Sequence, residues 1–518
     1  MFDTNFANLD WAIVVIYLIV AVVIGVLVNR FIHNVSDYMV GGRGSGAALN
    51  VATYIGTGLG LVTLMYASMD AFQHGFAYVT LALIGAAVGV FLGSTGFVIG
   101  RLRELSLTTI PEYFQKRFDR RTRVTAGVIC ALAGILNMGL FPKMGATFIT
   151  YATGLGAGDG NQALTVNIVT SVLIVLVLVY TIAGGMVSVI VTDFLQFIVL
   201  SIGLGLGVYY CLSLPDLGWE NMVATLSEHR GAKAFSPVAD GGYGWLWVFF
   251  NVVVFFAASI CWAPEASRAL TARDPRAARL TFLLGGPGQF IRLAIPALFA
   301  VAAFTLFCRD PGLAAYFFPE GPDGPVSHAG QAMPLLLGRI VPTGILGVLV
   351  AGLMAAFMST HDSYLLCWSS VITRDVVAPL RNEELSDRQQ IRLTRIIVLC
   401  VGVFLLAWGI WYPLPDSVWN YMAVTGTIYV SGSIVAIIGG MYWRRASSAG
   451  AFAALLCGLV ALAGLLPGME AYKKARPEWL EWLTGPVIGL ITFGCCAIVF
   501  VVVSLLCPDK PQQEAGRD

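Results

Sequence analysis

Charged residues are scarce in this chain. Only 12% of its 518 residues are Asp, Glu, Lys or Arg, whereas 57% are hydrophobic. Soluble domains carry about 25% charged residues, so this composition excludes an ordinary soluble protein and indicates a membrane protein with many spans. The formal net charge is only +1, which gives no indication of a nucleic-acid partner.

Patterns typical of metal sites, disulfides and cleaved leaders are missing too. The ten cysteines are scattered, without a CxxC pair, which argues against a zinc site and a disulfide framework. No nucleophile–base pair stands out, so we do not expect an enzyme. The first apolar run, from Trp11, lacks a basic segment before it and a small-residue cleavage site, so it is interpreted as a span.

Long apolar runs dominate the chain. A membrane-spanning helix needs about 20 apolar residues, and thirteen segments qualify, with approximate edges 10–29, 47–68, 77–100, 124–150, 165–184, 189–212, 244–264, 281–307, 335–370, 394–411, 418–442, 449–466 and 483–507. The ninth is too long for one span, so we expect an interfacial helix at Gln331–Arg339 before it. The predicted fold class is all-α integral membrane, with about 13 transmembrane helices.

Lys and Arg gather in alternate loops. The stretch Arg101–Arg123 is followed by basic loops at Arg268–Arg279, Arg374–Arg395 and Arg444–Arg445, whereas the loops 152–163, 213–243 and 308–334 are nearly free of them. Because cytoplasmic loops carry the excess of Lys and Arg, we expect a multi-pass protein of the cell membrane with its N-terminus outside. The C-terminal tail, 508–518, is then cytoplasmic, and its composition predicts disorder.

The second span, 47–68, is a poor continuous helix. Gly56, Gly58 and Gly60 alternate within it, and each glycine costs about 1 kcal/mol relative to alanine in a helix interior. Close packing through small residues is the alternative, but such glycines recur every fourth residue. The spacing therefore favours an unwound helix of the kind that lines a transport site.

Hydroxyl groups share one face of the ninth span. Ala356, Ser359 and Thr360 fall at i, i+3 and i+4, with Ser363 one turn below Ser359. A carbonyl and two hydroxyls are hard oxygen ligands, which suit sodium better than zinc or copper. The alternative is that both hydroxyls only bond to carbonyls four residues back, as often happens in membrane helices.

Seven ionisable residues stand at membrane depth or at span ends: Asp70, Lys143, Asp193, Glu265, Arg292, His361 and Asp362. A charge at the bilayer centre costs at least about 2.5–3.5 kcal/mol, so such residues are functional candidates. We expect Lys143 and Arg292 to pair with Asp193 and Asp362, unless one cation awaits an anionic solute. Glu265 and Asp70 are predicted to be solvated or capping, and His361 to be a satisfied polar residue.

Five segments, in this order and within this arrangement of spans, resemble the sodium:solute symporter family, which includes the sodium/glucose, sodium/proline and sodium/iodide transporters. They are SDYMVGGR (36–43), TTIPEYFQKRFDRRTR (108–123), YTIAGGMVSVIVTDFLQ (180–196), ASRALTARDPRAAR (266–279) and AAFMSTHDSYLLCWSSVITRDVVAPL (355–380). The resemblance implies two inverted five-helix repeats with broken helices, at 47–212 and 244–442. An extra helix and inner loop at 1–46 and extra helices at 443–507 flank them.

The resemblance also implies where sodium binds. Backbone carbonyls of Gly56 and Leu59 in the second span, the carbonyl of Ala356, and the hydroxyls of Ser359 and Thr360 match the family's sodium ligands.

A second ion site is implied one turn below, at Asp193, Ser359, Asp362 and Ser363. Asp362 replaces a small residue that is common in the family. This replacement leaves a second sodium and a proton as open alternatives.

Two positively charged side chains suggest the chemical class of the solute. Arg292 aligns with a lysine that touches sugar hydroxyls in sugar-carrying members, but the arginine fork suits a carboxylate better. Lys143 lies where some acid-carrying members place a cation, and Thr63 is a further candidate contact.

The resemblance therefore implies a secondary active transporter, which couples uptake of an organic acid or amino acid, rather than a sugar, to sodium by alternating access. Its implied partners are the solute, sodium and the lipid bilayer. The alternatives are a proton-coupled carrier that uses His361 and Asp362, or a transporter-like solute sensor.

Overall fold

The computed structural model describes residues 3–28, 47–156, 161–381, 385–415, 417–468, 472 and 477–509, and these contain helices but no strands. The first half forms α1 (Asn8–Val28), α3 (Ala47–Gly58), α4 (Leu61–His74), α5 (Val79–Thr95), α6 (Ile99–Glu104), α7 (Ile110–Arg117), α8 (Arg120–Met138), α9 (Phe141–Thr153), α10 (Gln162–Ser213) and α11 (Trp219–Arg230). The inner loop expected at 36–43 and the tail after residue 509 lie outside the described residues.

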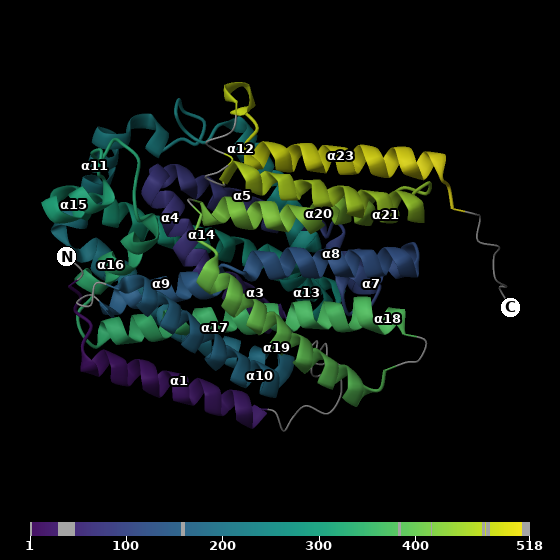
Figure 1. The fold of residues 1–518 in the computed structure, drawn as a ribbon, viewed down its shortest axis with the longest axis horizontal. Helices are drawn as coiled ribbons and strands as arrows, with labels where there is room; N and C mark the ends of the chain where they lie inside the picture. The colour runs from purple at the N-terminus through teal and green to yellow at the C-terminus, as the bar shows by residue number, and fades with distance from the viewer. Residues whose placement is uncertain are drawn as a thin grey trace.

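The second half forms α12 (Trp245–Cys261), α13 (Ala263–Thr271), α14 (Pro275–Arg309), α15 (Pro311–Phe317), α16 (Ala332–Ile340), α17 (Ile345–Val371), α18 (Ala378–Leu380), α19 (Asp387–Trp411), α20 (Val418–Tyr442), α21 (Ser448–Cys457) and α23 (Gly485–Leu506). A helix, α16, forms where the interfacial helix is expected at Gln331–Arg339, and its residues from Ala332 to Gly338 are buried in the protein. The long helices run roughly along one axis, and α1 begins at the end that carries α11 and α15, whereas α23 ends at the opposite end (Figure 1).

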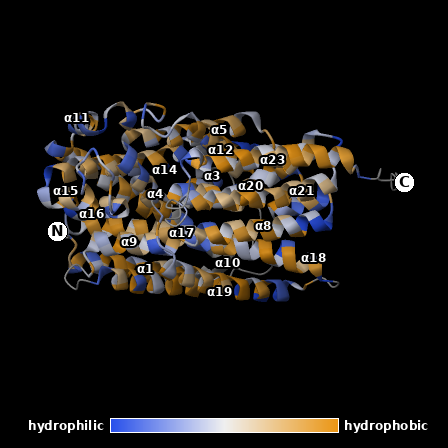
Figure 2. Cartoon of the chain, turned by 45° about the horizontal axis from the view of Figure 1, so that its top comes forward, coloured by the Kyte–Doolittle hydropathy of each residue, from blue (hydrophilic) through white to orange (hydrophobic). Residues whose placement is uncertain are grey.

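The surface of the bundle is apolar. Figure 2 shows hydrophobic residues along α1, α19 and α23, and hydrophilic residues near α11 and α15 at one end. Large hydrophobic side chains on these helices are exposed, including Ile16 at 61%, Val403 at 60% and Leu506 at 76%. A surface of this kind matches the acyl chains of a bilayer rather than water.

The predicted number of spans is not confirmed. Ten helical segments of the described chain are long and apolar enough to cross a membrane, or eleven when the bent pair α12–α13 counts as one. Helix α3 has only 12 residues, and the described apolar part of α1 is the short stretch Asn8–Ala21. The fifth and sixth predicted spans lie in one continuous helix, α10, whose parts Gln162–Val179 and Leu195–Ser213 are each long enough to span.

The second predicted span is broken, as its glycines predict. Helix α3 ends at Gly58 and α4 begins at Leu61. Between them Gly60 has extended backbone angles, with φ −76° and ψ 155°. The hydroxyl of Thr63 donates a hydrogen bond to the carbonyl of Gly58 across the break, at 3.0 Å.

A second bend, which sequence reasoning did not predict, lies at Trp262. Helices α12 and α13 meet there at 46°, and Pro264 occupies the first turn of α13. Proline has no backbone N–H to continue the ladder of α12, so Pro264 was the available signal. The two breaks bring backbone, hydroxyl and charged groups together inside the bundle.

Candidate functional site

The break in the second span lies against α17. A Cβ atom on Gly60 would overlap Oγ1 of Thr360 and lie 3.2 Å from its Cβ, so glycine is needed for this close approach. Thr360 is 5% exposed. The peptide groups of the break and the hydroxyl face of α17 therefore meet inside the protein, which is the arrangement that a site built of hard oxygen ligands requires.

The two hydroxyls on this face behave differently. Thr360 Oγ1 donates to the carbonyl of Ala356 at 3.0 Å, as the alternative of bonding four residues back predicts. Ser359 Oγ instead donates to Oδ1 of Asp193 on α10 at 2.5 Å. Because a hydroxyl that donates keeps lone pairs for accepting, both oxygens can still face a cation.

An arginine that the sequence prediction omitted lies beside Asp193. Arg268 on α13 has its Nη2 atom 3.8 Å from Asp193 Oδ2 and 3.5 Å from Ser363 Oγ. Its backbone carbonyl accepts a hydrogen bond from Asn50 at 3.1 Å. Arg268 is 4% exposed. A buried positive charge therefore already lies beside the residues predicted to bind a second ion. Its place in the segment ASRALTARDPRAAR was the available signal.

Asp362, the fourth residue of the predicted second ion site, is also buried. Its Oδ1 accepts a hydrogen bond from the backbone N–H of Ser363 at 2.7 Å. Part of its capacity to accept is therefore used within its own helix.

The expected pairing of Arg292 with a buried aspartate is wrong. Arg292 Nη1 donates to Gln289 at 2.9 Å and lies 3.5 Å from Oε1 of Glu265, and Nη2 donates to the hydroxyl of Tyr66 at 3.2 Å. The bend before α13 explains this difference, because Glu265 lies in its first turn. Glu265 is therefore an ion-pair partner inside the protein and not a solvated cap.

Lys143 lies apart from the group formed by Arg292 and Glu265. Its ammonium group donates to the backbone carbonyl of Tyr412 at 2.8 Å, so the expected pairing with an aspartate is wrong here as well. Asp70 differs too, because it is 3% exposed and its Oδ2 lies 3.3 Å from Ser417 Oγ. His361 is only partly satisfied, because Nδ1 donates to the carbonyl of Phe357 at 2.8 Å but the buried Nε2 has no hydrogen-bond partner among the described residues.

A central cavity lies where the two helix breaks meet α14 and α17. Its lining includes Gly58, Thr63, Thr360, Glu265, Arg268, Arg292 and Tyr364. A neighbouring hollow shares Glu265, Arg292 and Tyr364 and extends to Trp262 and Trp419. Lys143 belongs to neither lining. The cavity therefore offers an arginine fork and a carboxylate within one aromatic space, and the hydroxyl face of α17 forms its edge.

Comparison with known sequences identifies relatives along most of the chain. A family model described as "Sodium:solute symporter family" matches residues 38–458. The human sodium/glucose cotransporter 4 is 25% identical over 98% of this chain and 77% of its own length. The sodium/proline symporter of Haemophilus influenzae is 25% identical over 96% of this chain and 94% of its own length, and the sodium/sialic acid symporter SiaT of Proteus mirabilis is 24% identical over 88% and 89%.

Solved structures share the fold. A Na⁺-coupled sialic acid symporter in a substrate-bound outward-open state superposes with a TM-score of 0.75 at 20% identity, covering 98% of this chain and all of the other. The crystal structure of MhsT in complex with L-phenylalanine gives a TM-score of 0.52 at 16% identity, covering 88% of this chain and 97% of the other.

Proposed function

The chain belongs to the sodium:solute symporter family, and from this premise we propose that it carries a small solute with a carboxylate group, in particular an amino acid, together with sodium. Sodium is the coupling ion, as the family establishes. The observation that supports the solute class is the position of Arg292 and Glu265 in one cavity. An arginine fork suits a carboxylate, and a nearby carboxylate suits the ammonium group of an amino acid.

In this proposal sodium binds where the broken helix meets α17. The carbonyls of Gly56, Leu59 and Ala356 and the hydroxyls of Ser359 and Thr360 hold it. The contact between Gly60 and Thr360 supports this set, since Leu59 is next to Gly60. Sodium thereby joins α3 and α4 to α17 and favours a solute-ready state, because an ion shifts a conformational equilibrium only through its different affinities for the two states.

The solute binds next to this site. Thr63 bridges the two sites in the proposal, because it lines the cavity and its hydroxyl bonds to Gly58. Lys143 has no direct role in solute recognition, since its ammonium group bonds to Tyr412.

The membrane potential and the sodium gradient set the energy that each sodium ion supplies. One positive charge that crosses 100 mV releases about 2.3 kcal/mol, and a tenfold sodium gradient adds about 1.4 kcal/mol. Together they support accumulation of a neutral or zwitterionic solute by a few hundredfold per sodium. We therefore propose one sodium per cycle, with Arg268 supplying the positive charge beside Asp193.

The alternative is a second ion at Asp193, Ser359, Asp362 and Ser363. It requires Arg268 to move away from Asp193, because the two side chains approach to 3.8 Å. Two sodium ions per solute would therefore contradict the one-sodium proposal.

The orientation and the repeats are part of the same proposal. The basic starts of α8 and α14 and the turn after α17 support a cytoplasmic location for their end of the molecule. The N-terminus and the end that carries α11 and α15 are then outside. The repeats occupy 47–212 and 244–442, and the bent helices α3–α4 and α12–α13 occupy equivalent places at their starts, as inverted repeats require.

Uptake into proteoliposomes tests the function. Purified protein is supplied with labelled amino acids, dicarboxylates and sugars under an inward sodium gradient, with potassium as the control. We expect concentrative uptake of an amino acid in sodium only. Uptake that ignores sodium and follows pH would favour the proton-coupled alternative, and sodium-dependent binding without uptake would favour a sensor.

A further inference from the structure

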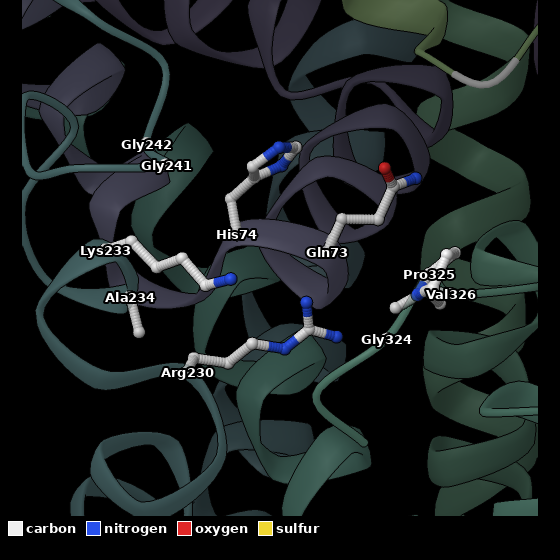
Figure 3. Close-up of a pocket in the computed structure, with 10 residues that line it drawn as sticks. All are labelled: Gln73, His74, Arg230, Lys233, Ala234, Gly241, Gly242, Gly324, Pro325 and Val326. Carbon is white, nitrogen blue, oxygen red and sulfur yellow. The ribbon is translucent and has the colours of Figure 1, made fainter. Parts of the chain in front are cut away.

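A basic pocket lies at the end of the molecule that carries α11 and α15, away from the central cavity. It is formed between the C-terminal end of α4 and the segment that follows α11. Figure 3 shows the ends of Arg230 and Lys233 pointing into the same space, with Gln73 and His74 beside it. Arg230 and Lys233 are the only Lys or Arg residues of the loop 213–243, and both line this one pocket.

Arg230 has hydrogen-bonding capacity that the described residues leave unused. Its Nε and Nη2 atoms are buried and have no hydrogen-bond partner in the described part of the chain. The guanidinium carbon lies 5.2 Å from the ring centre of Phe304, a cation–π contact that holds the group in place. Burial lowers the pKa of Arg230 below its usual range, so an anion in the pocket would stabilise its charged form.

Among the described residues, the lining of the pocket includes the cations Arg230 and Lys233 and no carboxylate. The carboxylate that acts on Arg230 is that of Asp323, which is itself paired with His229 at 3.2 Å. Lys233 adds a second cation to the lining. His74 is fixed by its stacking on Tyr243, with ring centres 4.2 Å apart.

The wall of the pocket depends on a close approach between two segments. Gly75, directly after α4, has φ +65°, and a Cβ atom there would lie 2.9 Å from the carbonyl oxygen of Ala234. Glycine adopts this backbone conformation without strain. The segment that carries Lys233 is therefore seated firmly against the end of α4, so the cations are presented by a packed structure.

We propose that this pocket binds a small carboxylate, as a second site for the carboxylate group of the transported solute. The solute class rests on the proposed function, because Arg292 in the central cavity presents the same kind of fork. Helix α4 connects the two places, since Tyr66 bonds to Arg292 and His74 follows eight residues later. That separation corresponds to about 12 Å along the helix, so the two places are near each other although their linings share none of the described residues.

Binding of acetate tests the proposal. Full-length protein in a non-ionic detergent, without sodium, is titrated with choline acetate at constant ionic strength, with acetamide as the neutral isostere and inorganic phosphate as the other anion. Calorimetry gives the affinity. The variants are Arg230→Gln, Arg230→Lys and Lys233→Gln. Arg309→Gln is the matched control, because this arginine lies at the same end but pairs with Asp216 at 3.0 Å.

We expect acetate to bind wild type and Arg309→Gln equally, and acetamide not to bind. Lys233→Gln should weaken acetate binding by at least about tenfold, the lower end of the effect of losing one charge-assisted hydrogen bond, and Arg230→Gln by more. Arg230→Lys keeps the charge if Arg230→Gln does not fold, and it should bind acetate with intermediate affinity.

Unchanged acetate affinity in Lys233→Gln, or equal binding of acetamide, would overturn the proposal. Tighter binding of phosphate than of acetate would assign the pocket to inorganic anions or phosphate headgroups instead. Retained acetate binding in Arg292→Gln places the measured site outside the central cavity. Loss of acetate binding in this variant would contradict a second site. Acetate binding is measured without sodium and without transport. Failure of carboxylate uptake would therefore refute the proposed solute without changing the result of the binding experiment.

Discussion

Ser359 and Asp193 join the hydroxyl face of α17 to α10 by a hydrogen bond of 2.5 Å. The donated proton orients the Ser359 oxygen, so that its lone pairs remain for a cation. Asp193 is 1% exposed and is therefore shielded from water. The pair thus links the candidate sodium site to the buried charges below it.

The double variant Ser359→Ala with Thr360→Ala should abolish sodium-dependent uptake, because it removes both side-chain ligands proposed for sodium. Surface expression should persist. Thr305→Ala is the matched control, since Thr305 is equally buried and bonds to the carbonyl four residues back at 2.9 Å, but lies on α14 away from the site. The measurement is uptake as a function of sodium concentration. Unchanged sodium dependence of the double variant would exclude the proposed sodium site.

Gly60→Ala should raise the sodium concentration for half-maximal uptake by at least about tenfold. The added methyl group would overlap Thr360 and push the broken helix away from α17, and a shift of about 1 Å at such a site can cost about a hundredfold. Gly494→Ala is the control, because a Cβ there meets nothing within 4 Å. Equal sodium activation in both variants would show that the break does not contribute to the site.

Asp193 and Arg268 should be energetically coupled. Arg268→Gln or Asp193→Asn alone leaves a buried charge without its partner, which typically costs about 3–5 kcal/mol of stability. The double variant should recover part of this loss, because the remaining groups are both neutral. Thermal unfolding of the four proteins measures the coupling, and strictly additive losses would show that the 3.8 Å approach is not an effective ion pair.

Arg292→Gln should raise KM for the carboxylate solute by roughly 10–150-fold, the range expected for one lost hydrogen bond to a charged group of about 1.5–3 kcal/mol. Arg292→Lys should recover only part of the lost affinity for the solute, since lysine lacks the two-pronged geometry of the guanidinium group. Lys143→Gln should change KM less than about twofold. A large effect of Lys143→Gln with none of Arg292→Gln would reverse the assignment of the cations.

Features carried by local sequence signals were predictable. The alternating glycines predicted the break that the structure places at Leu59 and Gly60, and helical spacing predicted the shared face of Ser359 and Thr360. The separate helix α16 followed from the length of its apolar run. Each of these depends on residues that are close in the chain, so propensity and period were sufficient.

Features that depend on distant segments were not predictable. Arg292 was expected near an aspartate, but the bend at Trp262 brings Glu265 to it instead. Arg268 was read as part of a basic loop, yet it is buried against Asp193. The number of spans differed because hydropathy cannot tell a helix that crosses the membrane from one that breaks within it.

Sodium-coupled binding of a carboxylate solute is tested by the thermal stability of the purified protein with amino acids, organic acids and sugars, each in sodium and in potassium. A ligand of the native state raises the unfolding temperature by mass action. We expect a carboxylate solute, in particular an amino acid, to stabilise the protein only in sodium, and Thr360→Ala to remove this effect. Stabilisation of equal size in potassium, or by sugars alone, would contradict it.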